Sequence, residues 1–523
     1  MRSAPFGVST WRRGFSLRMK SLSYFVHGFV FALGGPIILY GVVDNLNVLI
    51  HPADVLPPIV FSICAFSLFV LLAYALTRSL DSAGLIASIM VLGFFHLWSI
   101  FWAVIIITSI ALLAVKILFK KVRSADSHRV LNAVSIALVG FYLFRFMSMS
   151  VSALWSPVPV AIQPIQRAPA PTAKQAEAPD IYYIILDGYG RADMLQDIHD
   201  FDNSNFVTAL KERGFVVPSE SQSNYARTLL SLSSSLNMQY LDTAPSKGGG
   251  SDLWWPLKDD LQHSEVRRIL EDHGYKTIFL ANNADYSDIR DGDYYEAPFP
   301  IQLDIFSALF LYQTNFRPLA ELDQLGIANF SYATHRQIIL YEFRRLPEVA
   351  QIESPKYVFA HIVAPHPPYV FDREGNPMEP DYPFTLSVES HAGYVEQLQF
   401  INRATLDMVD GILANSKSPP IIIIQGDHGP GTMTNHDSLQ DTCLYERFSI
   451  LNALYLPGVD PASVATDLSP VNMFRFLFNR YFNGNLEILP NRQFFSTNDR
   501  FYEFTEVTGQ TQQMCSINSN DTP

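Results

Sequence analysis

The first 155 residues contain apolar stretches that are each long enough to cross a lipid bilayer. Crossing roughly 30 Å of hydrocarbon takes about 20 residues of α-helix. Three stretches of about this length lie near 22–43, 57–77 and 130–151. Only 17% of the whole chain is charged, against about 25% in an ordinary soluble domain. The pattern therefore excludes a simple soluble single domain and predicts a membrane-embedded N-terminal part.

A longer apolar run lies between the second and third of these stretches. From Ser82 to Leu118 the sequence is almost uncharged for 37 positions. As one helix this run would be about 55 Å long, which is more than a bilayer accommodates. We interpret it as two helices, 81–98 and 100–119, with a turn between them. One tilted helix with a buried extension is the alternative, which leaves four spans in place of five.

Basic residues decide between five spans and four. They gather before the first stretch, after the second and before the last, at Arg2, Arg12, Arg13, Arg18, Lys20, Arg78, Lys116, Lys120, Lys121, Arg123 and Arg129. Because positive loops face the cytoplasm, we expect a cytoplasmic N-terminus. Five spans then place everything after Trp155 outside the cytoplasm. The sequence predicts a multi-pass protein of the cell (inner or cytoplasmic) membrane, with its C-terminal domain periplasmic or extracellular.

The part after the apolar stretches differs sharply in charge from the part before it. Residues 1–150 carry 12 Lys or Arg and four Asp or Glu, a net charge of +8, whereas the rest carries 25 and 46, a net charge of −21. Such an acidic domain repels nucleic acid, so we expect no nucleic-acid partner. Residues 156–179 are rich in Pro and Ala, which predicts a semi-extended linker between the transmembrane domain, 1–155, and a soluble domain, 180–523.

Two further features of the soluble part leave alternatives open. Cys443 and Cys515 are the only cysteines outside the apolar stretches, and either a disulfide in an oxidising compartment or two thiols fits the sequence. Aromatic residues are plentiful there, among them Trp254-Trp255, Tyr294-Tyr295, Phe306 and Phe310. They fit the domain core, a surface resting on the membrane, or the wall of a lipid or sugar groove.

Beyond residue 180 the sequence alternates short apolar runs with segments of helix length. Continuous apolar runs of this kind are typical of parallel strands that are buried on both faces. They cover 181–186, 276–281, 356–363, 421–425 and 451–456. Helical apolar spacing occurs between them, for example over 203–213, 265–273 and 397–414. The alternation predicts an α/β fold whose sheet has helices on both faces.

Polar residues follow three of these strands. Asp187 comes directly after 181–186, Asp427-His428-Gly429 follows 421–425, and His366 follows 356–363. Functional groups in open α/β sheets collect beyond the carboxyl ends of the strands. Each residue alone is typical of an ordinary turn, but together they offer carboxylates and imidazoles, which suit Zn²⁺ or Mn²⁺.

A candidate nucleophile precedes a small-residue apolar run. Ser223-Asn224-Tyr225-Ala226-Arg227-Thr228 leads into LLSLSSSLNM, which is typical of a buried helix. Thr228 is then expected at the helix N-terminus, where backbone N–H groups and the helix dipole favour an alkoxide or a phosphate. A simple helix cap is the other interpretation of Thr228. Arg227, next to it, could bind a phosphate oxygen or be a solvated surface charge.

Asp187, Thr228 and Asp427-His428-Gly429, in this order and at these positions, resemble the alkaline phosphatase/sulfatase superfamily. With several spans before the domain, the chain resembles the membrane-anchored branch that includes lipoteichoic acid synthases and lipid A phosphoethanolamine transferases. The resemblance covers 180–460 best. It implies an N-terminal transmembrane helical bundle followed by a three-layer α/β/α domain, and a divalent cation, Zn²⁺ or Mn²⁺, as cofactor.

The resemblance also implies roles for single residues. Thr228 is implied as the nucleophile, which becomes transiently phosphorylated. The implied metal ligands are Asp187, Thr228, Asp427 and His428. His366 falls where such enzymes carry a histidine that contacts the substrate phosphate or a second metal. Arg227 and His436 are further candidates for substrate binding, whereas His361, within a strand, is expected to be a packed core histidine.

Two departures from the family pattern bear on the reaction. The transferase branch has Glu where this chain has Asp187, as phosphatases and sulfatases do. Sulfatases require a C/S-x-P-x-R motif, and the nearest match has Tyr225 at the Pro position. We therefore expect a metal-dependent phosphotransferase or phosphodiesterase that moves a phospho-substituent from a lipid donor to an envelope acceptor. The alternatives are a sulfatase-like phosphoester hydrolase whose substrate the sequence does not identify, and a non-catalytic envelope binding or assembly protein of the same fold.

Overall fold

The computed structural model divides the chain into two compact units. The first contains residues 1–155 and 301–328, and the second contains 156–300 and 329–523. Within them the structure describes residues 23–44, 52–94, 124–155, 178–241, 255–282, 284, 286–299, 303–317, 331–378, 388–513 and 515. The predicted span 100–119 and nearly all of the predicted linker lie outside the described residues.

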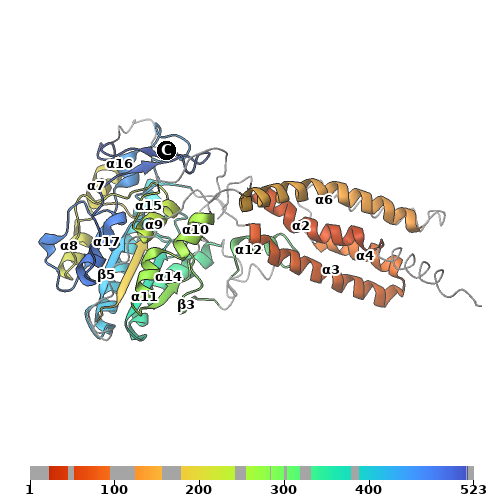
Figure 1. The fold of residues 1–523 in the computed structure, drawn as a ribbon, viewed down its shortest axis with the longest axis horizontal. Helices are drawn as coiled ribbons and strands as arrows, with labels where there is room; N and C mark the ends of the chain where they lie inside the picture. Colours follow the sequence, from red (N-terminus) through yellow and green to blue (C-terminus); the bar gives the residue numbers. More distant parts are fainter. Residues whose placement is uncertain are drawn as a thin grey trace, which may run out of the picture. The chain divides into compact units, whose positions relative to one another are not determined.

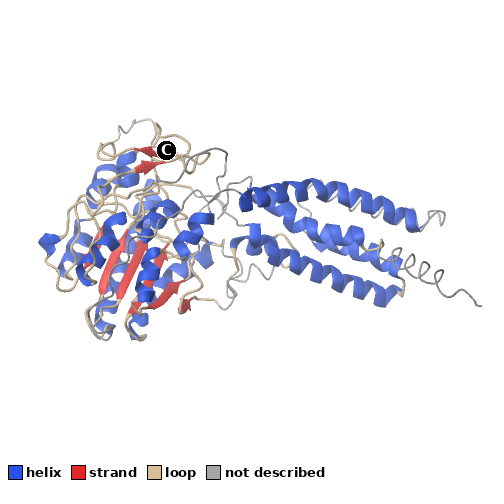
Figure 2. Ribbon diagram, viewed as in Figure 1, coloured by secondary structure: helices blue, strands red, loops and turns tan. Residues whose placement is uncertain are grey.

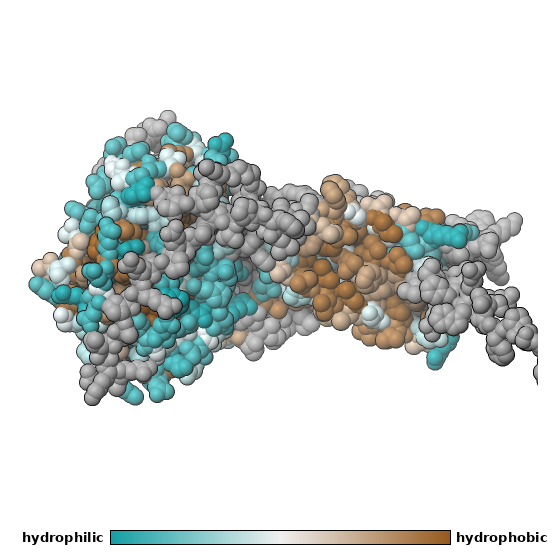
Figure 3. Space-filling view, viewed as in Figure 1, coloured by the Kyte–Doolittle hydropathy of each residue, from teal (hydrophilic) through white to brown (hydrophobic). Residues whose placement is uncertain are grey.

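The first unit, which we call the helical unit, is built from long apolar helices. They are α2 (Val26–Asp44), α3 (Leu56–Thr77), α4 (Leu80–Phe94) and α6 (Ser124–Trp155), with a 3₁₀ turn, η1 (Pro52–Val55), before α3. Helix α2 packs against the other three, and α3 packs against α4 (Figure 1). Apolar side chains cover the visible face of these helices (Figure 3).

Among the described residues, one helical stretch is long and apolar enough to cross a membrane. It runs over Pro52–Thr77. Shorter apolar helices cover Val26–Val42, Leu80–Phe94 and His128–Phe144. The described helices overlap four of the five predicted ones, 22–43, 57–77, 81–98 and 130–151, whereas the number of spans stays a prediction.

Helices α2 and α4 approach each other closely because glycines face the contact. A Cβ atom on Gly84 would lie 2.2 Å from the carbonyl oxygen of Tyr24, and one on Gly28 would lie 2.5 Å from Ser88 Oγ. Any larger residue at these positions would push the helices apart. Small residues at helix contacts of this kind are typical of membrane bundles.

A row of polar side chains, of which three are buried and Asp81 is half-buried, links α2, α4 and α6 beside this contact. His27 Nδ1 lies 2.6 Å from Ser88 Oγ, and His27 Nε2 lies 2.7 Å from His128 Nδ1. His128 Nε2 in turn lies 2.7 Å from Asp81 Oδ1. Asn132 accepts a hydrogen bond from the backbone N–H of His27 at 2.9 Å. We refer to His27, Asp81, Ser88 and His128 as the bundle cluster.

The second unit, which we call the catalytic unit, is organised around a six-stranded mixed sheet. Its strands are β1 (Ile181–Leu186), β2 (Lys276–Leu280), β3 (Tyr294–Glu296), β4 (Lys356–Ile362), β5 (Ile421–Gln425) and β6 (Asn452–Tyr455). The strand order is β3-β2-β4-β1-β5-β6 (Figure 2). A separate two-stranded sheet joins β7 (Phe494–Phe495) and β8 (Thr505–Glu506).

The five strands predicted from apolar runs are confirmed, with one correction. Strands β1 to β5 pair in parallel, but β6 runs antiparallel to β5. The apolar run of β6 indicates burial without indicating direction, so the expectation of a parallel strand was wrong there. Strand β3 was not predicted, because its three residues are too few to show a pattern.

Helices cover both faces of the sheet. Those described in this part of the chain are α7 (Ala192–His199), α8 (Ser204–Glu212), α9 (Thr228–Asn237), α10 (Trp255–Gln262), α11 (Glu265–Asp272), α14 (Tyr332–Glu348), α15 (His391–Asn415), α16 (Leu444–Phe448) and α17 (Pro470–Tyr481). Tyr182 and Ile184 of β1 pack with α7, α8, α14 and α15. On the other face, Tyr183 contacts Phe474 of α17 and Ser235 of α9. The sheet is therefore the middle layer of three.

A disulfide ties the C-terminal segment to this domain. Cys443 and Cys515 are bonded, with their Cα atoms 5.6 Å apart. Of the two states that the sequence left open, the structure has the disulfide, which is typical of an oxidising compartment.

Candidate active site

The topology of the sheet brings the predicted site residues to one edge. Asp187 follows β1 and Asp427-His428 follows β5, and these two strands are parallel neighbours in the sheet. Their carboxyl ends therefore meet, as expected for the functional edge of an α/β sheet. Close packing requires glycine just beyond the pair, because a Cβ atom on Gly429 would lie 1.9 Å from the carbonyl oxygen of Glu446.

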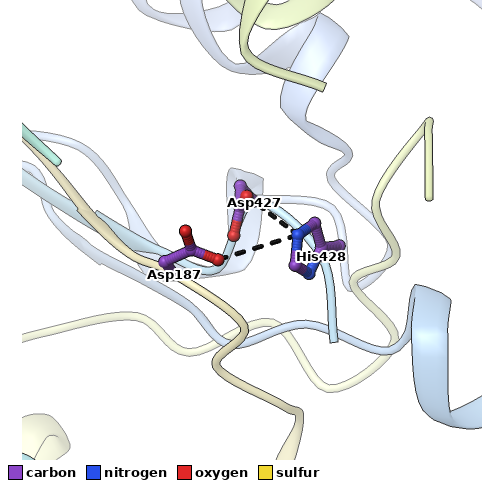
Figure 4. Close-up of side chains that lie close together, drawn as sticks. All are labelled: Asp187, Asp427 and His428. Carbon is purple, nitrogen blue, oxygen red and sulfur yellow. Dashed lines mark ion pairs between the residues drawn. The ribbon is translucent and has the colours of Figure 1, made fainter. Parts of the chain in front are cut away.

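Asp187, Asp427 and His428 converge on one small volume. One ligand atom from each lies within 4.8 Å of the others, and all three residues are buried. His428 Nε2 is 3.3 Å from Asp427 Oδ2 and 3.6 Å from Asp187 Oδ1 (Figure 4). It is also 3.0 Å from the Oγ1 atom of Thr228. We refer to these four residues as the catalytic cluster.

Two carboxylate oxygens of the catalytic cluster lack a hydrogen-bond donor among the described residues. His428 Nδ1 lies 2.9 Å from the Gly429 carbonyl, which can only accept, so Nδ1 carries the proton and Nε2 presents a lone pair. Asp187 Oδ1 and Asp427 Oδ2 are buried and have no hydrogen-bond partner within the described residues. Buried oxygens without partners are costly. A cation at this point would satisfy the lone pairs together, so the residues fit a divalent metal.

The electrostatics of the cluster agree with this interpretation. Burial and the charge of Asp187 raise the pKa of Asp427 to about 6. Burial opposes ionisation of Asp187 too, but the neighbouring histidines hold the pKa of that carboxyl below its ordinary value. Burial, together with the charge of Arg447, lowers the pKa of His428, which keeps the imidazole neutral. Two carboxylates and a neutral imidazole form an O/N ligand set of the kind that Zn²⁺ accepts.

Thr228 is the first residue of α9, as predicted from the sequence. Its neighbour Arg227 has extended backbone (φ −137°, ψ 139°), and the helix begins directly after it. The hydroxyl of Thr228 thus lies at a helix N-terminus, where N–H groups point outward without intrahelical partners. The half-buried Tyr286 lies close to it. Ser231, one turn on, donates to the Asp427 carbonyl at 2.7 Å and fixes α9 to the loop after β5.

The three residues suggested for substrate binding lie at the rim of the catalytic cluster. His366 is half-buried, and its ring centroid is 6.4 Å from that of His428. Burial alone would lower the pKa of His366, but the carboxylates of Asp187 and Glu389 outweigh burial and raise it. Arg227 donates to Asn498 Oδ1 at 2.8 Å and to the carbonyl of His436 at 3.2 Å. Substrate binding by the three stays a prediction.

Two residues of the site were not recognised in the sequence. Arg447 of α16 is buried and donates to the Ala226 carbonyl at 2.7 Å and to the Gly429 carbonyl at 3.1 Å, which joins the loops before Thr228 and after His428. Nothing in a short charged helix sequence indicates such burial. His361 is buried in β4 as expected, yet its Nε2 lies 3.2 Å from Asp187 Oδ2 and its Nδ1 lies 2.6 Å from Ser287 Oγ. It therefore orients a predicted ligand, which the expectation of a plain core residue overlooked.

The sulfatase family model matches residues 179–459 of this chain. The chain belongs to the sulfatase family. The matched residues run from the start of β1 to the end of β6 and include the whole catalytic cluster. The resemblance inferred from the sequence is thereby confirmed at the level of the family, and with it the assignment of the chain to a family of enzymes.

Several solved structures are similar to the chain at low sequence identity. The C-terminal periplasmic domain of EcEptC from Escherichia coli is 14% identical with a TM-score of 0.43, and the match covers 65% of this chain and 97% of that one. The periplasmic domain of phosphoethanolamine transferase EptC from Campylobacter jejuni is 12% identical with a TM-score of 0.36, covering 60% and 92%. A comparison with curated proteins finds no match.

Proposed function

We propose that the chain is a membrane-anchored, metal-dependent transferase in which Thr228 carries a phospho-substituent from a lipid donor to an acceptor of the cell envelope. The observation that supports this most directly is the position of the Thr228 hydroxyl. It lies at the N-terminus of a buried helix and 3.0 Å from His428 Nε2, beside two carboxylates that each have one oxygen without a hydrogen-bond partner among the described residues. A threonine that only capped the helix would not need an imidazole and two carboxylates beside its hydroxyl.

The catalytic cluster supplies the ligands for a divalent cation, Zn²⁺ or Mn²⁺. Asp187, Asp427, His428 and Thr228 would hold it. When bound, such a cation supplies positive charge that favours the alkoxide form of a hydroxyl and stabilises a transferred phosphoryl group. Arg447 and His361 keep the ligands in place through the contacts described above.

In the first half of the reaction, Thr228 Oγ1 bonds to the phosphorus of the donor and loses its proton. The bond between phosphorus and the lipid oxygen breaks, and that oxygen takes up a proton as the lipid hydroxyl. A phospho-threonine remains. His366, whose pKa is raised, is the residue best suited to contact the phosphate oxygens as an imidazolium.

In the second half, an acceptor hydroxyl attacks the same phosphorus and loses its proton. The bond to Thr228 breaks, and the threonine hydroxyl is restored. An envelope glycan or lipid as acceptor gives transfer, and water gives a phosphodiesterase. The apolar helical unit would hold the enzyme in the membrane where such a donor is found, with several spans and the catalytic unit outside the cytoplasm.

The proposal is tested by intact-mass measurement of the full chain in detergent, incubated with phosphatidylethanolamine or phosphatidylglycerol and Zn²⁺ or Mn²⁺. We expect the wild type to gain a covalent adduct whose mass separates phosphoethanolamine, phosphoglycerol and bare phosphate. Thr228→Ala should gain none. Thr466→Ala removes an exposed threonine that hydrogen-bonds Glu220 at 3.1 Å, and it should behave as the wild type.

The outcomes separate the possible errors. Bound metal with no adduct from either lipid would show that the donor is another molecule. An adduct that persists in Thr228→Ala would overturn the assignment of the nucleophile. No metal and no adduct would favour a non-catalytic binding protein of the same fold.

A further inference from the structure

One apolar helix from the part of the chain that follows the predicted linker belongs to the helical unit. Helix α12 (Ile305–Tyr312) has the sequence IFSALFLY and lies in the chain between β3 and α14, which are both in the catalytic unit. Residues 301–328 nevertheless group with residues 1–155. The chain therefore leaves the catalytic unit after β3, enters the helical unit and returns before α14.

The phenylalanines of α12 are buried among the helices of the bundle. Phe306 is 0% exposed and packs with Tyr40 of α2 and Val55 of η1. Phe310 is 2% exposed and packs in the cluster that contains Phe94 of α4. Close packing of these two side chains against their neighbours stabilises the short helix in the bundle.

Polar contacts fix the segment after α12 to the end of α4. The backbone N–H of Asn315 donates to the Phe94 carbonyl at 3.0 Å, and its side chain donates to the Gly93 carbonyl at 3.1 Å. The last carbonyl groups of a helix have no partners within the helix. Asn315 donates hydrogen bonds to two of these carbonyl groups. The segment therefore caps the C-terminal end of α4 and also covers its apolar side chains.

These partners lie at the end of the bundle opposite the basic residues. Tyr40 is in the last two turns of α2, Val55 precedes α3, and Phe94 ends α4. Arg78 follows α3 and Arg129 is in the second turn of α6, at the other end. Because basic residues mark the cytoplasmic side, α12 meets the bundle at its outer end. The C-terminal sequence thus reaches the bundle from the side on which the proposed function places the catalytic unit.

We propose that residues 303–317 are a second membrane anchor, which the catalytic unit inserts into the outer end of the bundle. This rests on the proposed function only for placing the bundle in a membrane. The anchor attaches the catalytic unit to the bundle independently of the linker at 156–179. The chain then passes between the units three times.

The proposal is tested by cutting the linker. A specific protease site is placed within 156–179 of the full chain, which carries an N-terminal affinity tag and is purified in detergent. After cleavage, the fragment that begins in the linker should stay bound with the tagged bundle through high-salt washes. Release of that fragment from the cleaved wild type would overturn the proposal. Retention requires no catalytic activity, so failure of the proposed function would not alter the result.

Two variants assign the retention to α12. Phe306→Asp combined with Phe310→Asp places charges in the apolar contact, and a Gly-Ser segment of equal length replaces residues 303–317 in the second variant. Both should release most of the cleaved fragment. Ile488→Asp changes an exposed residue of the catalytic unit, 51% accessible, and should be retained like the wild type. Retention of either α12 variant at the wild-type level would overturn the assignment, and an unchanged melting transition of the released fragment shows that release does not reflect unfolding.

Discussion

The molecule contains two largely buried clusters of histidine and carboxylate side chains, which differ in whether their polar atoms have hydrogen-bond partners. In the bundle cluster, Asp81 receives a contact from His128 at 2.7 Å, and His27 joins His128 to Ser88. In the catalytic cluster, two carboxylate oxygens have no donor within the described residues. Buried polar groups in proteins are normally satisfied. The bundle cluster therefore acts as a link between helices, whereas the catalytic cluster has the unpartnered oxygens that a divalent cation would satisfy.

The largest effect should come from the one hydroxyl of the catalytic cluster. Thr228→Ala removes the proposed nucleophile and leaves both carboxylates and His428 in place, so metal should still bind. We expect transfer to fall by at least about a thousandfold, as is usual when a nucleophile is lost. Transfer from a labelled lipid and metal content by mass spectrometry measure the two properties. Thr228→Ser keeps a hydroxyl and should retain part of the activity, and equal loss in both variants would contradict a nucleophilic role.

Removing one carboxylate of the catalytic cluster should weaken metal binding but stabilise the metal-free protein. Asp427→Asn should weaken metal binding by more than about a hundredfold, because a ligand is lost. Without metal, it removes a like charge next to Asp187 and should raise the unfolding free energy by up to about 1 kcal/mol. Titration with Zn²⁺ and melting in chelator measure both. Destabilisation of the metal-free variant would show that Asp427 has a structural role comparable to that of the bundle cluster.

Removing a polar side chain from the bundle cluster should lower the unfolding free energy and leave metal binding unchanged. His128→Phe keeps a ring but leaves Asp81 and His27 without their contacts to His128. We expect a loss of about 1–2 kcal/mol in the unfolding free energy, with metal content and transfer activity per folded molecule unchanged. Unfolding by detergent titration measures the first. Ser67→Ala removes an exposed hydroxyl that donates to the Ile63 carbonyl of the same helix, α3, at 2.8 Å, and serves as the control. Loss of bound metal in His128→Phe would break the distinction between the clusters.

The sequence predicted those features that depend on local pattern. The strands before Asp187 and Asp427 are continuous apolar runs, and Thr228 precedes a small-residue helix, so the catalytic cluster follows from strand ends and a helix start. Arg447 could not be found in this way, because its burial depends on two loops that are distant in sequence. The direction of β6 and the place of α12 depend on partners far along the chain for the same reason. An apolar octamer such as α12 has no feature of its own that separates a core helix from an anchor.

The smallest expected effect is the dependence of metal stabilisation on pH. The pKa of Asp427 is raised to about 6 by burial and by Asp187, so in the metal-free protein this carboxyl contributes stability below its ordinary pKa near 4, and that contribution is lost as the pH rises through 6. Metal binding requires the proton to leave. The gain in melting temperature at a fixed Zn²⁺ concentration should therefore be small at pH 5 and large at pH 7, with apparent affinity falling about tenfold per unit below 6.

His428 should add little to this dependence, because burial and Arg447 already lower its pKa and keep it neutral across that range. Melting of the full chain at pH 5, 6 and 7, with Zn²⁺ and with chelator, measures the gain. Asp427→Asn removes the titrating group and should show a gain that is small and independent of pH. An equal gain at pH 5 and pH 7 in the wild type would mean that the two carboxylates of the catalytic cluster do not share one cation. The two clusters would then differ only in their hydrogen-bond partners, and not in whether they bind a cation.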